Sequence, residues 1–156
     1  CPKERSVGFG EGSMTAQDAQ EVLCEVRDGI MVLTLNRPEK LNAYTAVMGA
    51  ELAEAVRKAG AEEKVRVIIL TGEGRGFCAG ADISAGAGSF DTTSAEGSAS
   101  FGDVSKTKGG GSGLVGAVFT CRKPSIVAYN GAAVGVGVTL TLPMDMDQRA
   151  GKASTR

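Results

Sequence analysis

The chain has 156 residues, a length that ordinarily folds as one domain, and its 42% hydrophobic and 22% charged residues are typical of a globular protein. Its 17 basic and 18 acidic residues give a net charge of −1 without a basic stripe, which argues against nucleic-acid binding. No apolar stretch reaches the roughly 18 residues that a membrane span requires. The absence of histidine excludes Ser-His-Asp and Cys-His nucleophiles and most catalytic metal sites, and the four scattered cysteines include no CxxC pair for zinc. We therefore expect neither a metal site nor a nucleic-acid partner.

The first residues differ from the rest of the chain. Residues 1–13 are polar and rich in glycine without periodicity, and Met14 would make a natural start. We expect residues 1–24 to be a leader or a disordered tail. This segment lacks the apolar core of a secretory signal, so we expect an intracellular location, with the cytoplasm, the mitochondrion and the peroxisome left open.

Strand and helix patterns alternate from there. The apolar residues 30–35 predict a strand that Pro38 closes, and apolar positions at helical spacing predict a helix over residues 44–59, ended by Gly60. The nearly continuous apolar stretch at residues 65–71 is typical of a strand buried on both faces.

The second half continues this alternation. Residues 84–113 are rich in Gly, Ser, Thr and Asp and predict a long loop, and residues 114–121 predict a short helix. Residues 125–129 repeat the apolar strand signature, and residues 133–142 predict another helix. The order implies an α/β fold whose strands are joined by crossover connections.

Two segments of small residues each follow an apolar, β-branched run. They are residues 77–83 (FCAGADI) and 130–137 (NGAAVGVG), and each looks like a strand end at which the backbone is bare. If the two turns face each other, two peptide N–H groups can point at one oxygen atom. That is the geometry of an oxyanion hole, which needs donors but no particular side chain.

Both segments also have structural interpretations. The first turn can be tight packing between a strand and a helix, and the second departs from the GxGxxG pattern of a dinucleotide site. The glycines at residues 109–111 lack the Lys-Ser/Thr of a phosphate-binding loop and indicate a linker. Cys78 has no cationic neighbour in sequence, so we interpret it as a buried small residue rather than a nucleophile.

Four motifs in register resemble the enoyl-CoA hydratase/isomerase (crotonase) superfamily. They are residues 36–43 (NRPEKLNA), 67–72 (VIILTG), 77–82 (FCAGAD) and 123–131 (KPSIVAYNG), and the similarity runs from about residue 25 to residue 146. The resemblance implies a crotonase-like spiral of ββα repeats and an acyl-CoA thioester as substrate, without a further cofactor. It also implies a homo-oligomer, usually a trimer or a hexamer, when the chain is complete.

The same resemblance implies roles for individual residues. The oxyanion donors would be the backbone N–H groups of Ala81 and Val136, and Val136 lies near the start of the predicted helix at 133–142, where the helix dipole also favours negative charge. Lys40 would either meet the CoA phosphates or be a solvated lysine of a turn. The other implied substrate contacts are Ala43, Ala79, Gly80, Asp82, Ile83 and Gly135, and no metal ligand is implied.

The acid and base groups of the family are missing. Hydratases of the family use two glutamates, of which one falls at Thr139, a residue that cannot act as a carboxylate base. The other would fall just beyond Arg156, and Asp145 matches an aspartate that we expect to be structural. The resemblance therefore implies a parent activity of Δ3–Δ2 enoyl-CoA isomerisation or hydration through an enolate. The alternative is a catalytically inactive truncated relative with at most weak acyl-CoA binding or assembly with intact subunits.

The end of the chain departs from the family pattern. Residues 147–156 (DQRAGKASTR) are polar and lack the next apolar strand. We expect them to form a divergent tail after a partial acyl-CoA-binding domain at residues 25–146, so that the ββα spiral is incomplete at the C-terminus. Such a half-spiral would leave apolar faces exposed, which favours aggregation or a partner chain.

Overall fold

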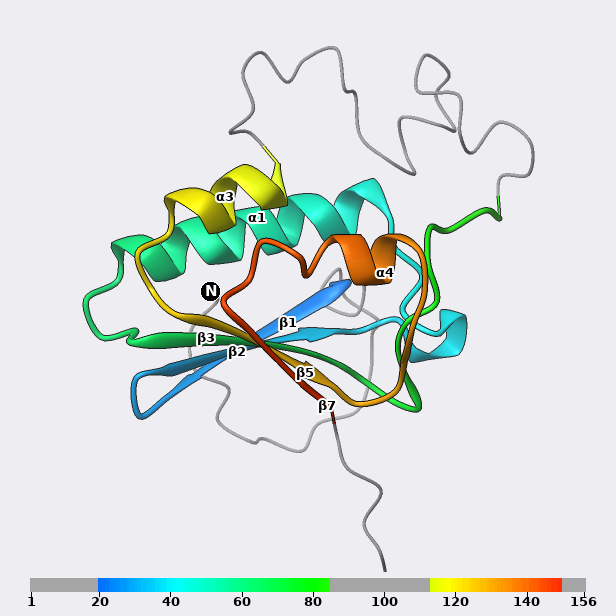
Figure 1. The fold of residues 1–156 in the computed structure, drawn as a ribbon, viewed down its shortest axis with the longest axis horizontal. Coiled ribbons are helices and arrows are strands. Elements are labelled where there is room, and N and C mark those ends of the chain that lie inside the picture. Colours follow the sequence, from blue (N-terminus) through cyan, green and yellow to red (C-terminus); the bar gives the residue numbers. More distant parts are fainter. Residues whose placement is uncertain (1–19, 85–112, 150–156) are drawn as a thin grey trace, which may run out of the picture.

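A five-stranded sheet carries the helices α1 (Ala46–Ala61) and α3 (Leu114–Thr120) side by side on one face (Figure 1). The structure, a computed structural model, describes residues 20–84 and 113–149. The predicted loop at residues 84–113 therefore lies almost entirely outside the described residues, as does most of the predicted leader and of the predicted tail.

The first unit of the chain is a hairpin followed by a helix. β1 (Val22–Arg27) and β2 (Ile30–Leu35) pair antiparallel through a turn at Asp28 and Gly29, whose φ angles of 51° and 82° are the left-handed values of a tight hairpin turn. The 3-10 helix η1 (Pro38–Lys40) then leads to α1. The buried residues of α1 recur at helical spacing, which turns one side of the helix toward the core.

The same ββα pattern follows twice more along the chain. β3 (Val67–Gly72) and β4 (Gly76–Cys78) precede α3, and β5 (Ser125–Tyr129) and β6 (Ala132–Ala133) precede α4 (Val136–Thr139). β4 and β6 pair in parallel as a separate two-stranded sheet. The predicted α/β fold with ββα repeats is confirmed.

The main sheet has the order β1-β2-β3-β5-β7, where β7 spans Met146–Arg149, and all pairs except β1 with β2 are parallel. Because β4 follows β3 and β6 follows β5, the small β4–β6 sheet lies beyond the carboxyl ends of two neighbouring strands. Ligands of open α/β sheets bind at this end of the strands.

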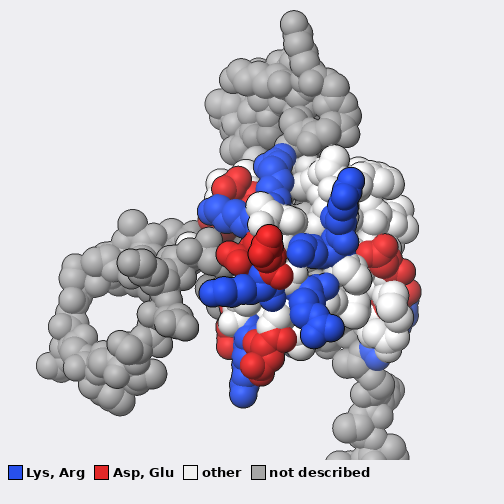
Figure 2. All heavy atoms as spheres, turned by 90° about the vertical axis from the view of Figure 1, so that its left-hand side faces the viewer, with Lys and Arg blue, Asp and Glu red and all other residues white. Residues whose placement is uncertain are grey.

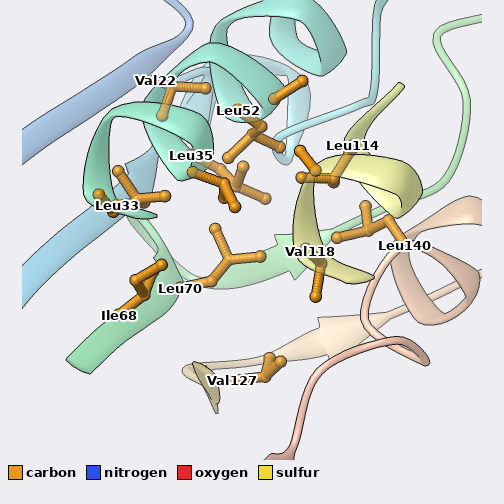
Figure 3. Close-up of a cluster of buried hydrophobic side chains, with 14 of the residues drawn as sticks. Val22, Leu33, Leu35, Leu52, Ile68, Leu70, Leu114, Val118, Val127 and Leu140 are labelled. Atoms are coloured by element: carbon orange, nitrogen blue, oxygen red, sulfur yellow. The ribbon is translucent and has the colours of Figure 1, made fainter. Parts of the chain in front are cut away.

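The core lies between the two helices and the main sheet (Figure 3). Alternate residues of β2, β3 and β5 are buried, and most residues between them are half-buried. The core side chains labelled in Figure 3 include Leu33, Leu35, Leu52, Ile68, Leu70, Leu114, Val118 and Val127. β3 was predicted to be buried on both faces; within the described residues only the face under the helices is fully covered, because α1 and α3 lie on that side alone.

Most predicted elements are present, with one clear difference. Residues 30–35 and 125–129 are strands as predicted, and the predicted helices at 44–59 and 114–121 correspond to α1 and α3, although α1 continues through Gly60 and ends at Ala61. The predicted helix at 133–142 is wrong in extent, because α4 forms only one turn. The preceding residues pair with β4, and Gly135, with a φ of 54°, separates that pairing from the helix.

The described domain extends past both predicted boundaries. β1 begins at Val22, inside the predicted leader, because Val22 is buried and its backbone pairs with β2. β7 includes Asp147 and Arg149 of the predicted tail, although every residue of this strand is exposed. Its polar sequence is compatible with an edge strand, since pairing with β5 uses the backbone and needs no apolar side chain.

The surface in Figure 2 carries basic and acidic side chains interspersed over one face of the molecule. This face is not uniformly positive, unlike the surfaces that bind nucleic-acid phosphates. None of the helices in residues 20–84 and 113–149 has the length and apolar character needed to span a bilayer. In the same residues, no three His, Cys, Asp or Glu side chains gather in a way that could hold a metal ion.

Candidate functional site

Two turns of the chain meet at the small sheet. β4 and β6 are paired, and the Val134 N–H donates to the Cys78 carbonyl at 2.9 Å, so the residues after β4 run beside the residues after β6. Gly137 allows this approach, because a Cβ atom there would lie 2.6 Å from the Cys78 carbonyl oxygen, whereas one on Gly80 would make an ordinary contact of 3.5 Å with the Val134 carbonyl oxygen. The structure thus brings together the two segments of small residues.

The N–H of Ala81 is directed by a neighbouring segment. Tyr44 and Ala81 form a parallel bridge, in which the Tyr44 N–H donates to the Gly80 carbonyl at 2.8 Å and the Asp82 N–H donates to the Tyr44 carbonyl at 2.9 Å. The C=O and N–H of a trans peptide point in opposite directions, so the bond to Gly80 turns the Ala81 N–H away from Tyr44. No hydrogen bond among the described residues uses this N–H.

The N–H of Val136 lies at the start of α4. Gly135 is the N-cap residue, and its carbonyl accepts from the Thr139 N–H at 3.2 Å. The first N–H groups of a helix have no carbonyl one turn earlier, and in the described part of the chain the Val136 N–H has no acceptor. Because α4 has only four residues, few aligned peptides add to a dipole there, and the predicted dipole support is small. Ala81 and Val136 each offer one donor on adjoining turns.

A cavity of about 400 Å³ opens beside Val136. Its wall includes Tyr44 and Thr139, and the other lining residues are Gly113, Leu114, Val115, Gly116 and Leu140. Burial raises the pKa of the Tyr44 phenol above its ordinary value, so this side chain is neutral near pH 7. None of these lining residues carries a carboxylate or an imidazole. The described wall can hold an apolar group but offers no acid–base pair.

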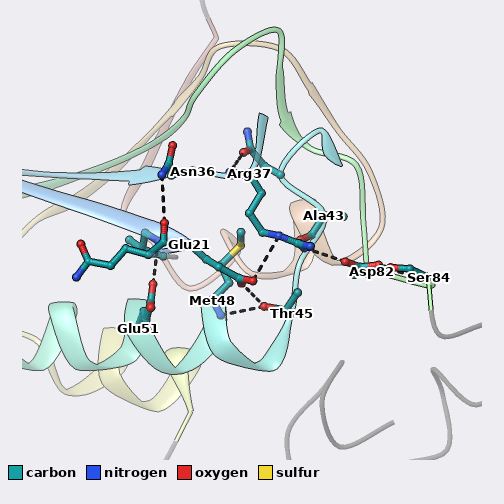
Figure 4. A network of polar contacts seen from close by, with 12 residues as sticks. Glu21, Asn36, Arg37, Ala43, Thr45, Met48, Glu51, Asp82 and Ser84 are labelled. Carbon is teal, nitrogen blue, oxygen red and sulfur yellow. Dashed lines mark hydrogen bonds and ion pairs between the residues drawn. The ribbon is translucent and has the colours of Figure 1, made fainter. Parts of the chain in front are cut away.

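The carboxylate of Asp82 is held by neighbouring side chains (Figure 4). The Nη1 atom of Arg37 lies 2.9 Å from Asp82 Oδ2, and the Ser84 N–H donates to Oδ1 at 3.0 Å. The Ser84 hydroxyl donates to the same oxygen. The hydrogen bonds from Ser84, followed by the Arg37 guanidinium, lower the pKa of Asp82 to about 2. The structure therefore uses Asp82, a predicted substrate contact, to hold the first turn.

Three other predicted contact residues shape the two turns. Gly80 and Gly135 lie close together, since a Cβ atom on Gly135 would lie 4.0 Å from the Gly80 Cα, and their φ angles of 107° and 54° are left-handed. The Ala79 N–H donates to the Leu41 carbonyl at 3.0 Å, which ties the first turn to the segment after η1. These contacts give the turns a defined backbone path.

The remaining predicted contacts lie further out. The Ala43 carbonyl accepts from the Arg37 guanidinium at 2.7 Å, so Ala43 supports the first turn through its backbone. Ile83 is 60% exposed, and Lys40 is exposed at the end of η1. Neither Ile83 nor Lys40 belongs to the cavity wall.

The two positions considered for acid–base groups have different surroundings. Thr139 lines the cavity, and its hydroxyl donates to the Val136 carbonyl at 3.3 Å. Asp145 accepts from the N–H and the hydroxyl of Ser125, each at 2.8 Å, and these bonds lower the pKa of Asp145. As expected of a structural aspartate, it links β5 to the segment before β7.

Cys78 is fully buried in β4. Burial raises the pKa of its thiol, which keeps the thiol protonated and poorly nucleophilic. This agrees with its interpretation as a buried small residue.

Two asparagines of the sequence motifs hold the turn before β4, a role that the sequence did not reveal. The Asn42 side chain is fully buried, accepts from the Arg37 N–H at 2.8 Å and donates to the Gly76 carbonyl at 2.9 Å. The Asn130 side chain donates to the same carbonyl at 3.3 Å and to the Gly74 carbonyl at 2.8 Å. The signal that could have indicated this role is the asparagine beside small residues in each motif. A side-chain amide that is buried there needs hydrogen-bond partners, and the nearby backbone carbonyls can supply them.

Comparisons with known proteins identify the family of the chain. The family model described as enoyl-CoA hydratase/isomerase matches residues 25–155. An enoyl-CoA hydratase of Alternaria alternata is 38% identical over 114 residues, which are 70% of this chain and 34% of that protein. The 1,2-epoxyphenylacetyl-CoA isomerase of Escherichia coli (strain K12) is 48% identical over 63 residues, which are 40% of this chain and 24% of that protein.

Solved structures have the same fold. The crystal structure of an enoyl-CoA hydratase from Mycobacterium marinum superposes with a TM-score of 0.67 at 34% sequence identity, covering 84% of this chain and 58% of that one. This chain thus spans about a third of the Alternaria enzyme and little more than half of the solved chain. The family match includes most of the predicted tail at residues 147–156. The chain belongs to the enoyl-CoA hydratase/isomerase family.

Proposed function

We propose that this chain binds an acyl-CoA thioester and that the N–H groups of Ala81 and Val136 form its oxyanion hole. The observation that carries the proposal is a pair of N–H groups on adjoining turns, each without an acceptor in the described residues. One of them, that of Val136, belongs to a residue that lines a largely apolar cavity. The relatives support the substrate class, because one is named an enoyl-CoA hydratase and another an epoxyphenylacetyl-CoA isomerase.

The two donors would act on the thioester oxygen. When a base removes a proton from the carbon beside the thioester carbonyl, negative charge moves onto that oxygen and an enolate forms. Donors that are fixed in advance stabilise this charge without having to reorganise, and losing one donor typically costs about 3–4 kcal/mol of transition-state stabilisation. The apolar side chains of the cavity would cover the acyl group.

The parent activity that we propose is Δ3–Δ2 enoyl-CoA isomerisation or hydration. Isomerisation moves a proton from C2 to C4, and a single carboxylate can remove and return it. Thr139 lines the cavity at the position of one of the two glutamates that hydration needs, and a threonine cannot act as a carboxylate base. This substitution favours isomerisation, which can proceed with the other carboxylate alone.

A second candidate is a relative that binds the thioester without converting it. The observation that favours it is the cavity wall, in which none of the described lining residues is an acid. This candidate predicts affinity for an acyl-CoA together with no turnover.

Replacing Val136 with proline tests the oxyanion role, because proline removes one N–H and is tolerated at the first position of a helix. Val136→Ala is the matched control, since it shortens the side chain and keeps the N–H. Calorimetry with butanoyl-CoA measures binding, and absorbance assays with 3-hexenoyl-CoA and 2-hexenoyl-CoA measure isomerisation and hydration. We expect Val136→Pro to lower affinity by about tenfold, or turnover by about 100- to 1,000-fold, and Val136→Ala to change either far less.

Each result selects between the candidates. Absence of thioester binding by the unmodified chain contradicts the substrate class. Equal binding and turnover in the folded proline and alanine variants contradict the oxyanion role. Binding without conversion of either enoyl-CoA supports the non-catalytic relative.

A further inference from the structure

Arg37 connects the segment that contains Ala81 and Asp82 with the neighbouring segment that contains Ala43 (Figure 4). Its Nη1 atom donates to the Ala43 carbonyl at 2.7 Å and lies 2.9 Å from Asp82 Oδ2. Its Nε atom lies 3.4 Å from a carboxylate oxygen of Glu21, beside the start of β1. The side chains of Arg37 and Asp82 are only 17% and 14% exposed, so this ion pair is largely shielded from water.

These contacts surround the bridge that directs the Ala81 N–H. Ala43 precedes Tyr44 and Asp82 follows Ala81, so a single guanidinium nitrogen holds both sides of the Tyr44–Ala81 bridge. The peptide that carries the Ala81 N–H has its carbonyl on Gly80. Because Gly80 has no side chain, it restricts the rotation of this peptide less than any other residue would. Contacts from outside the turn must therefore set the direction of the N–H.

Arg37 also balances charge beside the turn. Asp82 directly follows Ala81, and its carboxylate is ionised at neutral pH. A bare negative charge at this position would oppose negative charge on an oxygen bound to the Ala81 N–H. The guanidinium, 2.9 Å from the carboxylate, offsets that repulsion.

We propose that Arg37 is a positioning residue that aims the Ala81 N–H at the thioester oxygen. This role rests on the proposed function, since it presupposes the oxyanion hole. A residue that only stabilises the fold would alter the free energy of unfolding. A positioning residue also alters the surroundings of the Ala81 amide and the polarisation of a bound thioester carbonyl in variants that remain folded.

The test compares Arg37→Lys and Arg37→Met with the unmodified chain. Lysine keeps the charge but lacks the planar fork that reaches the Ala43, Asp82 and Glu21 oxygens together. The matched control is Arg27→Lys, because the Arg27 side chain is 83% exposed and pairs only with the neighbouring Asp28 among the ion pairs of the described residues. Asp82→Asn serves as a further variant that loses the charge pair if Arg37→Met does not fold.

Two measurements are made on each folded variant. The first is the amide NMR spectrum of the free protein, in which we expect the Ala81 resonance to shift while the Val136 resonance stays in place. The second is the infrared stretching frequency of bound butanoyl-CoA labelled with 13C at the carbonyl. We expect Arg37→Lys to lose about half or more of the frequency shift on binding and, where turnover occurs, to lower kcat roughly 10- to 100-fold with KM nearly unchanged.

The outcomes separate this inference from the proposed function. An Ala81 resonance and a carbonyl frequency that are the same in both Arg37 variants and in the unmodified chain overturn the positioning role. A thioester that binds the unmodified chain without any frequency shift overturns the oxyanion hole itself. An Arg27→Lys variant that reproduces the Arg37 effects overturns the inference as well, because the effects would then follow from any loss of arginine.

Discussion

At position 137 the packing leaves no room for a side chain, which makes Gly137 a test of how closely the turns approach. An added Cβ atom would lie 2.6 Å from the Cys78 carbonyl oxygen and 2.8 Å from the Cys78 Cβ. We expect Gly137→Ala to lower the free energy of unfolding by about 1–3 kcal/mol, because α4 must move away from β4. Denaturant unfolding measures the change.

Gly60→Ala is the control for this substitution. Gly60 also lies in a helix, but its added Cβ would make an ordinary contact of 3.6 Å with Cys121 Sγ. We expect Gly60→Ala to be neutral or to stabilise the protein by up to about 1 kcal/mol. Equal destabilisation by both substitutions would contradict the close approach of the turns.

The pairing of Asp82 predicts a pH dependence of stability. The folded pKa of Asp82, about 2, lies below the ordinary value of about 3.9, so the unfolded chain binds this proton at higher pH than the folded chain does. The resulting stabilisation is complete above about pH 4 and is lost as the pH falls through about 2. We expect the difference in Tm between the unmodified chain and Asp82→Asn to shrink over this interval. A constant difference from pH 5 to pH 2 would disagree with the assignment.

Within the site, the backbone path of the two turns was easier to predict than the bonds of the side chains around them. The small residues around Ala81 and Val136 indicated two bare turns, and the structure brings these turns together. The sequence did not reveal the side-chain bonds of Arg37 and Asn42, because their partners are backbone atoms and carboxylates brought near by the fold. For the same reason the sequence did not show that the Asp82 carboxylate, a predicted substrate contact, is held by Arg37 and Ser84.

Among the elements, α1 has an N-terminus that depends on one hydroxyl group. The Thr45 hydroxyl accepts from the Met48 N–H at 3.0 Å and is also bonded to a Glu21 carboxylate oxygen. We expect Thr45→Ala to lower the free energy of unfolding by about 1 kcal/mol, and Thr45→Ser to restore most of the loss because serine keeps the hydroxyl. Thermal or denaturant unfolding of the unmodified chain, Thr45→Ala and Thr45→Ser measures these changes in stability. Equal loss in the serine and alanine variants would show that the methyl group, not the cap, matters.

The sequence predicted strands and long helices better than it predicted short or polar elements. β2 and β5 are buried on alternate residues, so their apolar runs carry a clear signal. α4 was predicted too long because small apolar residues fit a helix as well as they fit the β6 pairing and the left-handed turn at Gly135. β7 was missed because an exposed edge strand is specified by backbone pairing, which leaves no apolar pattern.

At the scale of the whole molecule, the most exposed of the large apolar side chains in the described residues are those of Phe119 and Leu142. Phe119 of α3 is 75% exposed, and Leu142, which follows α4, is 72% exposed. Exposed apolar surface favours association, so we expect Phe119→Ser and Leu142→Ser each to lower self-association in sedimentation velocity experiments. Lys58→Ser is the control, because Lys58 is a half-exposed member of an ion pair within a helix, and its replacement removes no apolar side chain. Association that persists unchanged in both serine variants would show that these side chains do not mediate contacts.

The overall fold was predictable because four motifs occur in one order, which a chance similarity seldom achieves. The ββα order and the family were both correct. The predicted burial of β3 on both faces was not, because an apolar strand does not specify which segments cover it, and the described helices cover one face. The chain spans only part of the length of its relatives, so the activity of those longer proteins is proposed for this chain and not assigned to it.

The central claim is that the N–H groups of Ala81 and Val136 bind a thioester oxygen. The most direct measurement is the infrared stretching frequency of the 13C-labelled carbonyl of butanoyl-CoA, free and bound to the unmodified chain. Two hydrogen bonds to the oxygen weaken the C=O bond, so we predict a lower frequency in the complex and a smaller decrease in the complex with Val136→Pro. A bound carbonyl with the frequency of the free thioester would contradict the claim.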